Sequence, residues 1–432
     1  MMSNDEVIAS GAFFGRKDLT EYQVPDGVTA IGDDAFGFCE NLRHIAIPDG
    51  VRSIGHRAFA NCTSLKVMKL PASVSDIGDM AFAGCRSLED ITFPAMEFFH
   101  PDTVGGCHSI RHVAISGRYA NDSEAIYTAD GQELCLVLPK PNRDNVEIPE
   151  GVLRIGPKAF SLCDGLRALS LPSSIESIDE AAFDGCHWLE EIRVRPDGIF
   201  SSHCGILMSD GIAIRCPQAI KKSRIAIAQG VVAIGARAFL GCENVTEVLL
   251  PSSLERIGEC AFAHSKNLKA VLDGDLISVG GKAFLGCVSL SDLPDVDAAD
   301  SIGPYAFGEC KGIEKARIPD GVLTIEEGVF VDCERLASVD FNDEVTSIGE
   351  QAFLGCKALK SVDLPARIQR IGYGAFAWSG LQAIAIPNGV EDVAPMAFGI
   401  CKDLELASAP RRLSASIDSI FYGCDKLSSL TI

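Results

Sequence analysis

Residues 42–62 read Leu42-Arg-His-Ile45-Ala-Ile47-Pro48-Asp-Gly50-Val51-Arg-Ser-Ile54-Gly55-His-Arg-Ala58-Phe59-Ala-Asn-Cys62, and this pattern recurs along nearly all of the 432 residues. Within each uninterrupted run the phenylalanine returns every 23 residues, or in two places after 22. A fixed period of this length is the signature of a repeat architecture, so we expect one array and not several ordinary globular domains. The 16 anchor positions are Phe13, Phe36, Phe59, Phe82, Val104, Phe160, Phe183, Phe239, Phe262, Phe284, Phe307, Phe330, Phe353, Phe376, Phe398 and Phe421.

Each unit has the pattern of a short strand followed by a tight corner. Apolar alternation up to Ile47 predicts a strand, Pro48 ends it because proline cannot donate to a ladder, and Gly50 belongs to a turn. The segment from Gly55 to Phe59 predicts a corner or a single helical turn. One unit cannot bury its own apolar face, so neighbouring units must stack. We therefore predict an α/β-type right-handed solenoid of about 18 turns over residues 1–432, with a parallel strand ladder on the concave face and short helical or irregular turns on the convex face.

Two longer intervals interrupt the period. Val104 to Phe160 and Phe183 to Phe239 each span 56 residues, which is two periods plus ten. Each interval contains an Asp-Gly pair between apolar alternations, a strong signal for a β-hairpin. We expect an extra turn with a protruding hairpin in each, in the irregular units near 117–149 and 196–228.

Charge and hydropathy exclude several classes of partner. Lysine and arginine number 38 against 59 acidic residues, a net charge of 38 − 59 = −21, which repels phosphate backbones and anionic lipids. The sequence has no run of about 18 apolar residues, so membrane insertion is not expected. The first residues, Met1 to Glu6, are acidic where a signal peptide is basic, which favours a cytoplasmic location. Nucleic acid and membranes are therefore not expected as partners.

The repeat carries a family resemblance. The string Ile54-Gly55-x-x-Ala58-Phe59-x-x-Cys62-x-x-Leu65, followed by Leu70-Pro71, resembles the BspA-type leucine-rich repeat of bacteria and protists. The resemblance covers residues from about 11 to 432 and implies a parallel-strand solenoid with a non-enzymatic function. It also implies adhesin-like binding of host or bacterial proteins at the cell surface. An intracellular scaffold or binding protein is the alternative that the amino-terminal sequence leaves open.

Cysteines are concentrated at one position of the repeat, three residues after the phenylalanine. Parallel side chains in such a column do not readily reach disulfide geometry, so we interpret them as buried thiols, and Ser265 and Ser379 indicate that a small buried side chain suffices. The sequence has no Cys-x-x-Cys pair to suggest a zinc site, and so many free thiols suit a reducing compartment. Outside the column, Cys204 and Cys216 are the likeliest pair to bond if the protein is exported. The 13 column members are Cys39, Cys62, Cys85, Cys107, Cys163, Cys186, Cys242, Cys287, Cys310, Cys333, Cys356, Cys401 and Cys424.

Two groups of residues are candidate metal sites. Asp273 and Asp295 occupy a strand position that is apolar in nearly every other unit, with Asp275, Asp297 and Asp300 nearby. Either these acidic side chains turn to solvent or they hold a cation. A calcium site formed by Asp273, Asp295 and Asp297 predicts that calcium raises the melting temperature of the protein. The second group is His100, Cys107, His108 and His112, which we expect to diverge because Cys107 has a core position and His112 a solvent position.

The outward side chains of the predicted strands form the candidate surface for a protein partner. They are mixed in charge and mostly small, and contain no catalytic triad or basic stripe, so we expect no enzyme activity and no cofactor. The hairpins are a second candidate surface. The last strand pattern, Leu427 to Ile432, has no polar capping unit, which suggests self-association through the C-terminal turn. The partner-binding candidates are His44, Lys69, His112, Glu191, Arg193, Glu247, Lys315, Arg317, Asp340 and Asp363.

Overall fold

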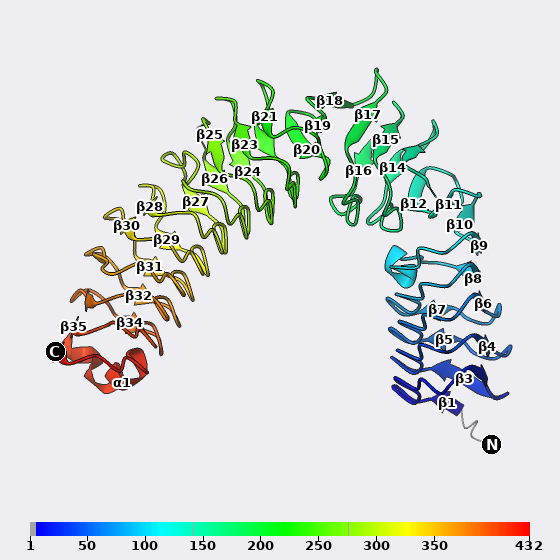
Figure 1. Cartoon of the computed structure of the whole chain (residues 1–432), viewed down its shortest axis with the longest axis horizontal. Helices are drawn as coiled ribbons and strands as arrows, with labels where there is room; N and C mark the ends of the chain where they lie inside the picture. Colours follow the sequence, from blue (N-terminus) through cyan, green and yellow to red (C-terminus); the bar gives the residue numbers. More distant parts are fainter. Residues whose placement is uncertain (1–5, 141, 275) are drawn as a thin grey trace. The chain divides into compact units, whose positions relative to one another are not determined.

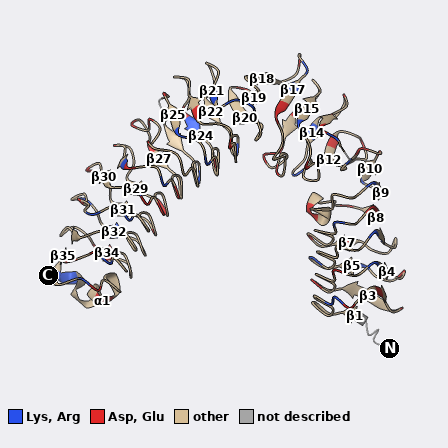
Figure 2. Cartoon of the chain, in the orientation of Figure 1, with Lys and Arg blue, Asp and Glu red and all other residues tan. Residues whose placement is uncertain are grey.

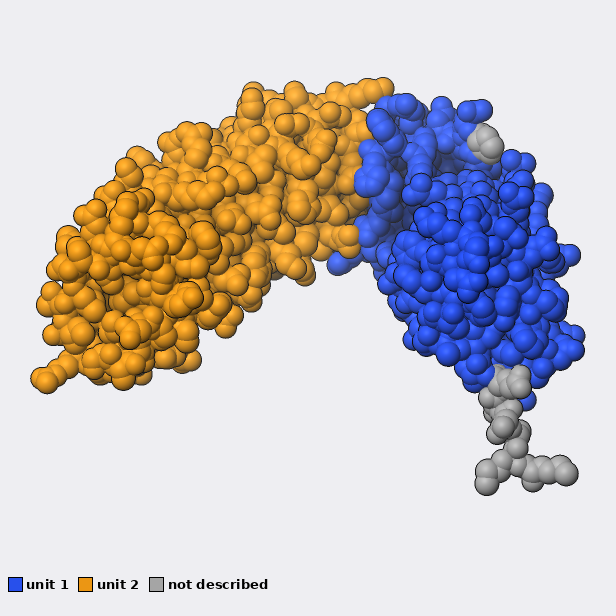
Figure 3. Space-filling view, turned by 60° about the horizontal axis from the view of Figure 1, so that its bottom comes forward, with its two compact units in different colours: residues 1–199 blue, residues 200–432 orange. Residues whose placement is uncertain are grey.

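The chain forms a parallel β-solenoid of about 18 turns with little helix, as predicted from its period. The computed structural model describes residues 6–140, 142–274 and 276–432. It divides into two compact units, Met1–Ile199 and Phe200–Ile432, which we call unit 1 and unit 2 (Figure 3). The sequence-based assignment of residues 1–432 to one array remains a prediction.

The predicted strand is present in most repeats and forms what we call the first ladder, but no strand forms at residues 291–299 or 361–365. Successive strands pair in parallel with a 23-residue offset, as in Glu21 with His44 and Lys315 with Ser338. In unit 1 these strands are β2 (Glu21–Gln23), β4 (His44–Ala46), β6 (Val67–Lys69), β8 (Asp90–Met96), β9 (His112–Gly117), β13 (Asn145–Glu147), β15 (Ala168–Leu171) and β17 (Glu191–Val194). In unit 2 they are β21 (Arg224–Ala226), β23 (Glu247–Leu249), β25 (Ala270–Leu272), β28 (Lys315–Arg317), β30 (Ser338–Asp340), β33 (Ala383–Ala385), β35 (Leu406–Ser408) and β36 (Ser429–Thr431).

A second ladder, which was not predicted from the sequence, runs in most units through the isoleucine or valine that precedes the recurring glycine. Ile54 pairs with Ile31 and Ile77, and its side chain is buried. The following Gly55 lies so close to the previous turn that a Cβ atom would come within 2.6 Å of the Asp33 nitrogen, which explains the glycine. The strands are β1 (Glu6–Ile8), β3 (Val28–Ile31), β5 (Ser53–Ile54), β7 (Asp76–Ile77), β14 (Arg154–Ile155) and β16 (Ser177–Ile178) in unit 1, and β22 (Ala233–Ile234), β24 (Arg256–Ile257), β26 (Ser278–Val279), β27 (Ser301–Ile302), β29 (Thr324–Ile325), β31 (Ser347–Ile348), β32 (Arg370–Ile371) and β34 (Asp392–Val393) in unit 2.

The Ala-Phe corners stack as turns rather than helices. The amide of Phe59 donates to the carbonyl of Ala81 in the next turn at 2.8 Å, and the rings of Phe59 and Phe82 lie 5.4 Å apart and nearly parallel. Left-handed φ angles at Arg57 and Asn61 flank the corner and prevent a helix from propagating. In the described residues, helical segments are limited to η1 (Pro101–Val104), η2 (Arg411–Ser416) and α1 (Ile417–Ile420).

The position of the first ladder in unit 2 differs from the sequence-based expectation. Figure 1 shows the strands β28 and β30 on the outer side of the curve of unit 2 and the corner turns on its inner side. The hydrogen bonds agree with this arrangement. Bonds between corners join successive turns, as from the Phe307 amide to the Val329 carbonyl at 3.0 Å. The first ladder of unit 2, in contrast, is divided into three separate sheets. The inner side of a curved coil requires the closer spacing, and the corners of unit 2, which hydrogen bonds join from turn to turn, lie on that side.

Both predicted hairpins are present, each as a three-stranded antiparallel sheet that joins the second ladder. In unit 1 the strands are β10 (Tyr119–Asn121), β11 (Ala125–Thr128) and β12 (Glu133–Val137), and β12 pairs in parallel with β14. In unit 2 they are β18 (Phe200–His203), β19 (Ile206–Ser209) and β20 (Ile212–Arg215), and β20 pairs with β22. Asp210 and Gly211 both have positive φ angles, as a two-residue type I′ turn requires.

Candidate interaction surface

The first-ladder strands expose alternate side chains, and the predicted partner-binding residues lie among them. In β4, β6 and β28 the central residue is buried, and the residues on either side of it are exposed or half-buried. Nine of the ten candidates are exposed, Glu247 is half-buried, and Asp363 lies outside any described strand. His44, Lys69, His112, Glu191 and Arg193 belong to unit 1, and Glu247, Lys315, Arg317, Asp340 and Asp363 to unit 2.

Four of the candidate charges on this surface, Glu191, Arg193, Glu247 and Arg317, are paired with their neighbours. Arg193 contacts Glu191 at 2.6 Å, and Arg317 contacts Asp297 at 3.2 Å. Glu247 contacts Arg224, its partner in register on the adjacent strand, at 3.1 Å. Figure 2 shows basic and acidic residues interspersed along both units without a stripe of one sign. The surface therefore has the mixed polarity of a protein interface rather than the basic field that nucleic acids require.

The acidic residues considered for calcium do not converge. Asp273, Asp295 and Asp297 are all exposed, and Asp275 lies outside the described residues. Asp297 is paired with Arg317, while an oxygen of Asp295 accepts the Asp297 amide at 3.2 Å. Among the residues that the structure describes, no group of three or more His, Cys, Asp or Glu side chains has a metal-binding arrangement.

The histidine and cysteine group diverges as expected. Cys107 is fully buried and its thiol donates to the Phe82 carbonyl at 3.1 Å, whereas His112 is exposed on β9. His108 lies 3.2 Å from Asp164, and His100 lies 3.7 Å from Asp102. Cys107, His108 and His100 therefore have separate partners, and none of these partners is shared with the exposed His112.

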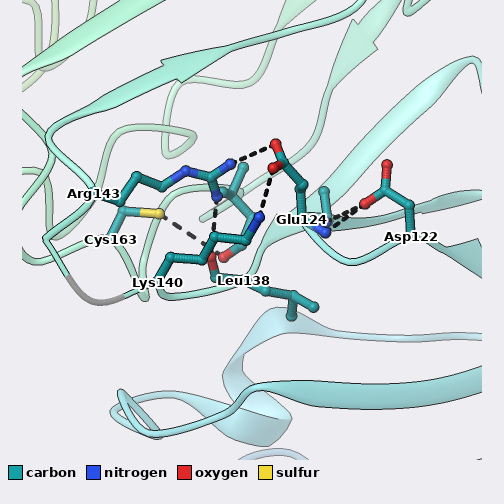
Figure 4. A network of polar contacts seen from close by, with 8 residues as sticks. Asp122, Glu124, Leu138, Lys140, Arg143 and Cys163 are labelled. Atoms are coloured by element: carbon teal, nitrogen blue, oxygen red, sulfur yellow. Dashed lines mark hydrogen bonds and ion pairs between the residues drawn. The ribbon is translucent and has the colours of Figure 1, made fainter.

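A polar network holds the first hairpin sheet to the loop that follows it (Figure 4). Glu124, between β10 and β11, accepts from Lys140 at 2.5 Å and from Arg143 at 2.6 Å. The bond from Lys140 is the main cause of the lowered pKa of Glu124, with Arg143 adding to it, so this carboxylate stays ionised. Arg143 also donates to the Leu138 carbonyl at 3.3 Å. This arrangement positions the sheet and is not that of an acid–base pair poised near neutral pH.

Sequence analysis identified the cysteine column but missed the bond that it makes. Each of the 13 column thiols donates to a main-chain carbonyl 25 or 26 residues earlier, at 3.0 to 4.0 Å. Ser265 makes the same bond to Phe239 at 2.7 Å. All 17 cysteines are free, with Cys204 exposed and Cys216 buried. The signal was available in the sequence, because serine is the residue that replaces cysteine in this column.

The structure also contains the two other surfaces predicted for binding, which are the hairpins and the C-terminal turn. The hairpin sheets β10–β12 and β18–β20 fall within the two irregular units. In the C-terminal turn, all three residues of β36 are exposed. Across the described ranges, no helix is long and apolar enough to span a membrane.

Comparisons with solved structures found other leucine-rich repeat proteins. A leucine rich cell surface protein from Faecalibacterium prausnitzii A2-165 is 25% identical over 78% of this chain and 83% of its own, with a TM-score of 0.48. A leucine-rich repeat protein from Eubacterium ventriosum ATCC 27560 is 17% identical over 88% of each chain, with a TM-score of 0.48. One from Bacteroides ovatus ATCC 8483 is 24% identical over 99% of this chain and 87% of its own, with a TM-score of 0.37. A search of curated proteins gave no match.

The comparison with family models gives the family. The model for the BspA type leucine rich repeat region (6 copies) matches residues 6–126, 140–203, 216–337 and 324–432. These segments cover most of the chain and contain the stacked corners and both ladders. The protein therefore belongs to the BspA-type leucine-rich repeat family, a repeat module of the protein-binding kind.

Proposed function

We propose that the protein is a non-enzymatic, adhesin-like module that binds a host or bacterial protein through the exposed side chains of its first-ladder strands. The observation that carries this proposal is the row of outward, mixed-charge residues on regularly spaced strands. Such a surface is extended and shallow, which suits a protein partner better than a small substrate.

Some of these charges remain available to a partner. Within the described residues, Lys69, Lys315, Asp340 and Asp363 have no ion-pair partner, although all four are exposed. Lys315 and Arg317 lie on the same strand, β28, two residues apart and therefore on the same face. A partner with acidic side chains would pair with Lys315 at little cost in desolvation, and Arg317, which already contacts Asp297, would add to the attraction.

Charge reversal at one of these residues tests the surface. The protein would be tested for binding to a panel of immobilised matrix proteins, first unchanged and then as Lys315→Glu. Arg411→Glu is the matched control, since Arg411 is an exposed basic residue that lies in η2 and not on a first-ladder strand. We expect Lys315→Glu to weaken capture by about tenfold and Arg411→Glu to leave it unchanged. Equal effects of the two substitutions, or no capture by any matrix protein, would contradict the proposal.

An intracellular scaffold is the second candidate, and one observation favours it. All 17 cysteines are free thiols, including the exposed Cys204, as is usual in a reducing compartment. Protease treatment of intact source cells separates the two candidates. Release of peptides from this chain without those of a cytosolic marker supports the adhesin, whereas protection until lysis supports the scaffold.

A further inference from the structure

A groove of about 750 Å³ lies in unit 1 between the loop after β8 and the tip of the first hairpin sheet. One wall is formed by Glu97 to Pro101, and the facing walls by the corner Gly117 to Tyr119 and the turn Thr128 to Asp130. Glu133, Cys135 and Arg154 complete the lining from β12 and β14. Its volume lies in the range of small-molecule binding sites.

The groove exists because the second ladder of unit 1 is interrupted there. The ladder runs from β1 to β7 and resumes at β12, so in the described chain no strand of this ladder fills the intervening turn. Instead the chain bends at Gly117, whose φ of 87° and close approach to the Met96 backbone exclude other residues. The bend directs the chain into β10 and leaves the space open.

An aromatic side chain stands at the edge of this groove. Phe98 is 80% exposed, the highest value among the large exposed apolar side chains of the described residues. The adjacent Phe99 is buried, its amide donates to the Tyr119 hydroxyl at 2.9 Å, and the two rings meet edge to face at 5.9 Å. Phe98 is therefore held on an anchored segment while its ring remains available for stacking.

The polar lining is charged but internally balanced. Arg118 contacts Glu97 at 3.4 Å, and Arg154 contacts Glu133 at 3.2 Å. Asp130 accepts from the Thr128 hydroxyl at 2.6 Å, and this bond is the main cause of its lowered pKa. Each guanidinium has five N–H donors, and the bond described here occupies one of them. The groove thus presents donors beside acceptors without a strong excess of either charge.

We propose that this groove binds a neutral carbohydrate. A pyranose ring has an apolar C–H face that stacks on an aromatic ring such as Phe98. Its hydroxyl groups each donate and accept, so they match the Arg118–Glu97 and Arg154–Glu133 pairs, and hydrogen bonds to charged groups are the stronger ones. An anionic ligand would meet the carboxylates of Glu97, Asp130 and Glu133, and a cationic ligand the two arginines. A neutral polyol avoids both conflicts.

The test uses the full chain and an array of neutral oligosaccharides built from glucose, galactose, mannose and N-acetylglucosamine, with sialylated and sulfated sugars on the same array. Calorimetric titration with the best neutral probe then follows. We expect millimolar or tighter binding of a neutral probe and about tenfold weaker binding by Phe98→Ala. Because Phe98 is exposed, this variant is expected to keep its fold, which circular dichroism checks. Trp378→Ala, at an aromatic side chain 55% exposed in unit 2, is the matched control.

Arg154→Gln provides a second variant that probes the polar wall, and we expect it also to weaken binding. The proposal is overturned if no neutral probe binds, if acidic sugars bind in preference, or if Phe98→Ala binds as well as the unchanged chain. Loss of a protein partner in Phe98→Ala, without any saccharide binding, would place this groove in the protein interface and exclude the carbohydrate. The result is independent of the Lys315 test, which concerns a strand of unit 2.

Discussion

The thiol of Cys310 donates a hydrogen bond to the carbonyl oxygen of Phe284 in the preceding turn at 3.1 Å. The same carbonyl accepts the amide of Cys287 at 3.0 Å, so it serves both its own corner and the next one. Cys310 is fully buried, which makes the bond inaccessible to water. The column therefore joins successive turns through side chains as well as through the backbone.

Substitution of Cys310 measures what this bond contributes. Cys310→Ser retains a small donor, as Ser265 does naturally, and we expect the free energy of unfolding to change by less than about 1 kcal/mol. Cys310→Ala removes the donor and leaves a small void, for which we expect a loss of about 1–2 kcal/mol. Urea unfolding followed by circular dichroism gives both values. Equal losses in the two variants would show that only the volume of the side chain matters.

The same thiols predict unfolding in alkali. Burial raises the pKa of Cys287 and of Cys333 from 9.0 to about 12. Between pH 9 and pH 12 the unfolded chain releases protons that the folded chain retains, so stability is constant below about pH 9 and falls above it. Each such thiol contributes about 1.4 kcal/mol per pH unit to this fall. Urea midpoints measured from pH 7 to pH 10.5 should show the decline. The double variant Cys287→Ser/Cys333→Ser should decline less steeply, and an unchanged slope would assign the effect to other groups.

The sequence predicted the features that depend on local periodicity. Most of the first-ladder strands, the corners at Phe59 and its equivalents, and the Asp210-Gly211 turn follow from residue spacing and turn chemistry, and the structure confirms them. It did not predict the second ladder, because two residues such as Ser53 and Ile54 are too short to show a strand period. The first ladder of unit 2 does not lie on the concave face where the sequence analysis placed it, because curvature depends on the relative spacing of the bonded columns.

The exposed strand residues of the candidate surface could be predicted from the sequence, whereas the groove could not. Alternation correctly identified exposed strand residues such as Lys69 and Lys315. The groove at Phe98 depends on an interruption of the second ladder, and it joins residues from Glu97 to Arg154 that have no common sequence period. A site of this kind becomes visible only when the turns are stacked in space.

Calcium provides a test of the acidic residues of unit 2. Asp273, Asp295 and Asp297 are exposed, and Asp297 already pairs with Arg317. Strong calcium binding requires about six to eight oxygen ligands around one point, which scattered exposed carboxylates do not supply. We therefore expect 5 mM calcium to leave the melting temperature unchanged. Any difference should be no larger than the one found with an equal concentration of magnesium. A rise specific to calcium, abolished by Asp295→Asn, would restore the calcium hypothesis.

Alkylation should distinguish the accessible thiols from the buried column. Cys204 is exposed, and Cys424 is partly exposed with its pKa lowered to about 7, chiefly because the neighbouring Cys401 thiol, whose own pKa is raised, can donate to the Cys424 thiolate once Cys424 has lost its proton. We expect iodoacetamide to label Cys204 and Cys424 in the folded protein, and the remaining column only after denaturation. The labelling rate at Cys424, followed by mass spectrometry, should level off above about pH 8, because the thiolate is then fully formed. In Cys401→Ala the bond is absent, so the rate at Cys424 should continue to rise toward pH 9, while Cys204 behaves as before. A profile at Cys424 that is the same in both proteins would show that Cys401 does not stabilise its thiolate.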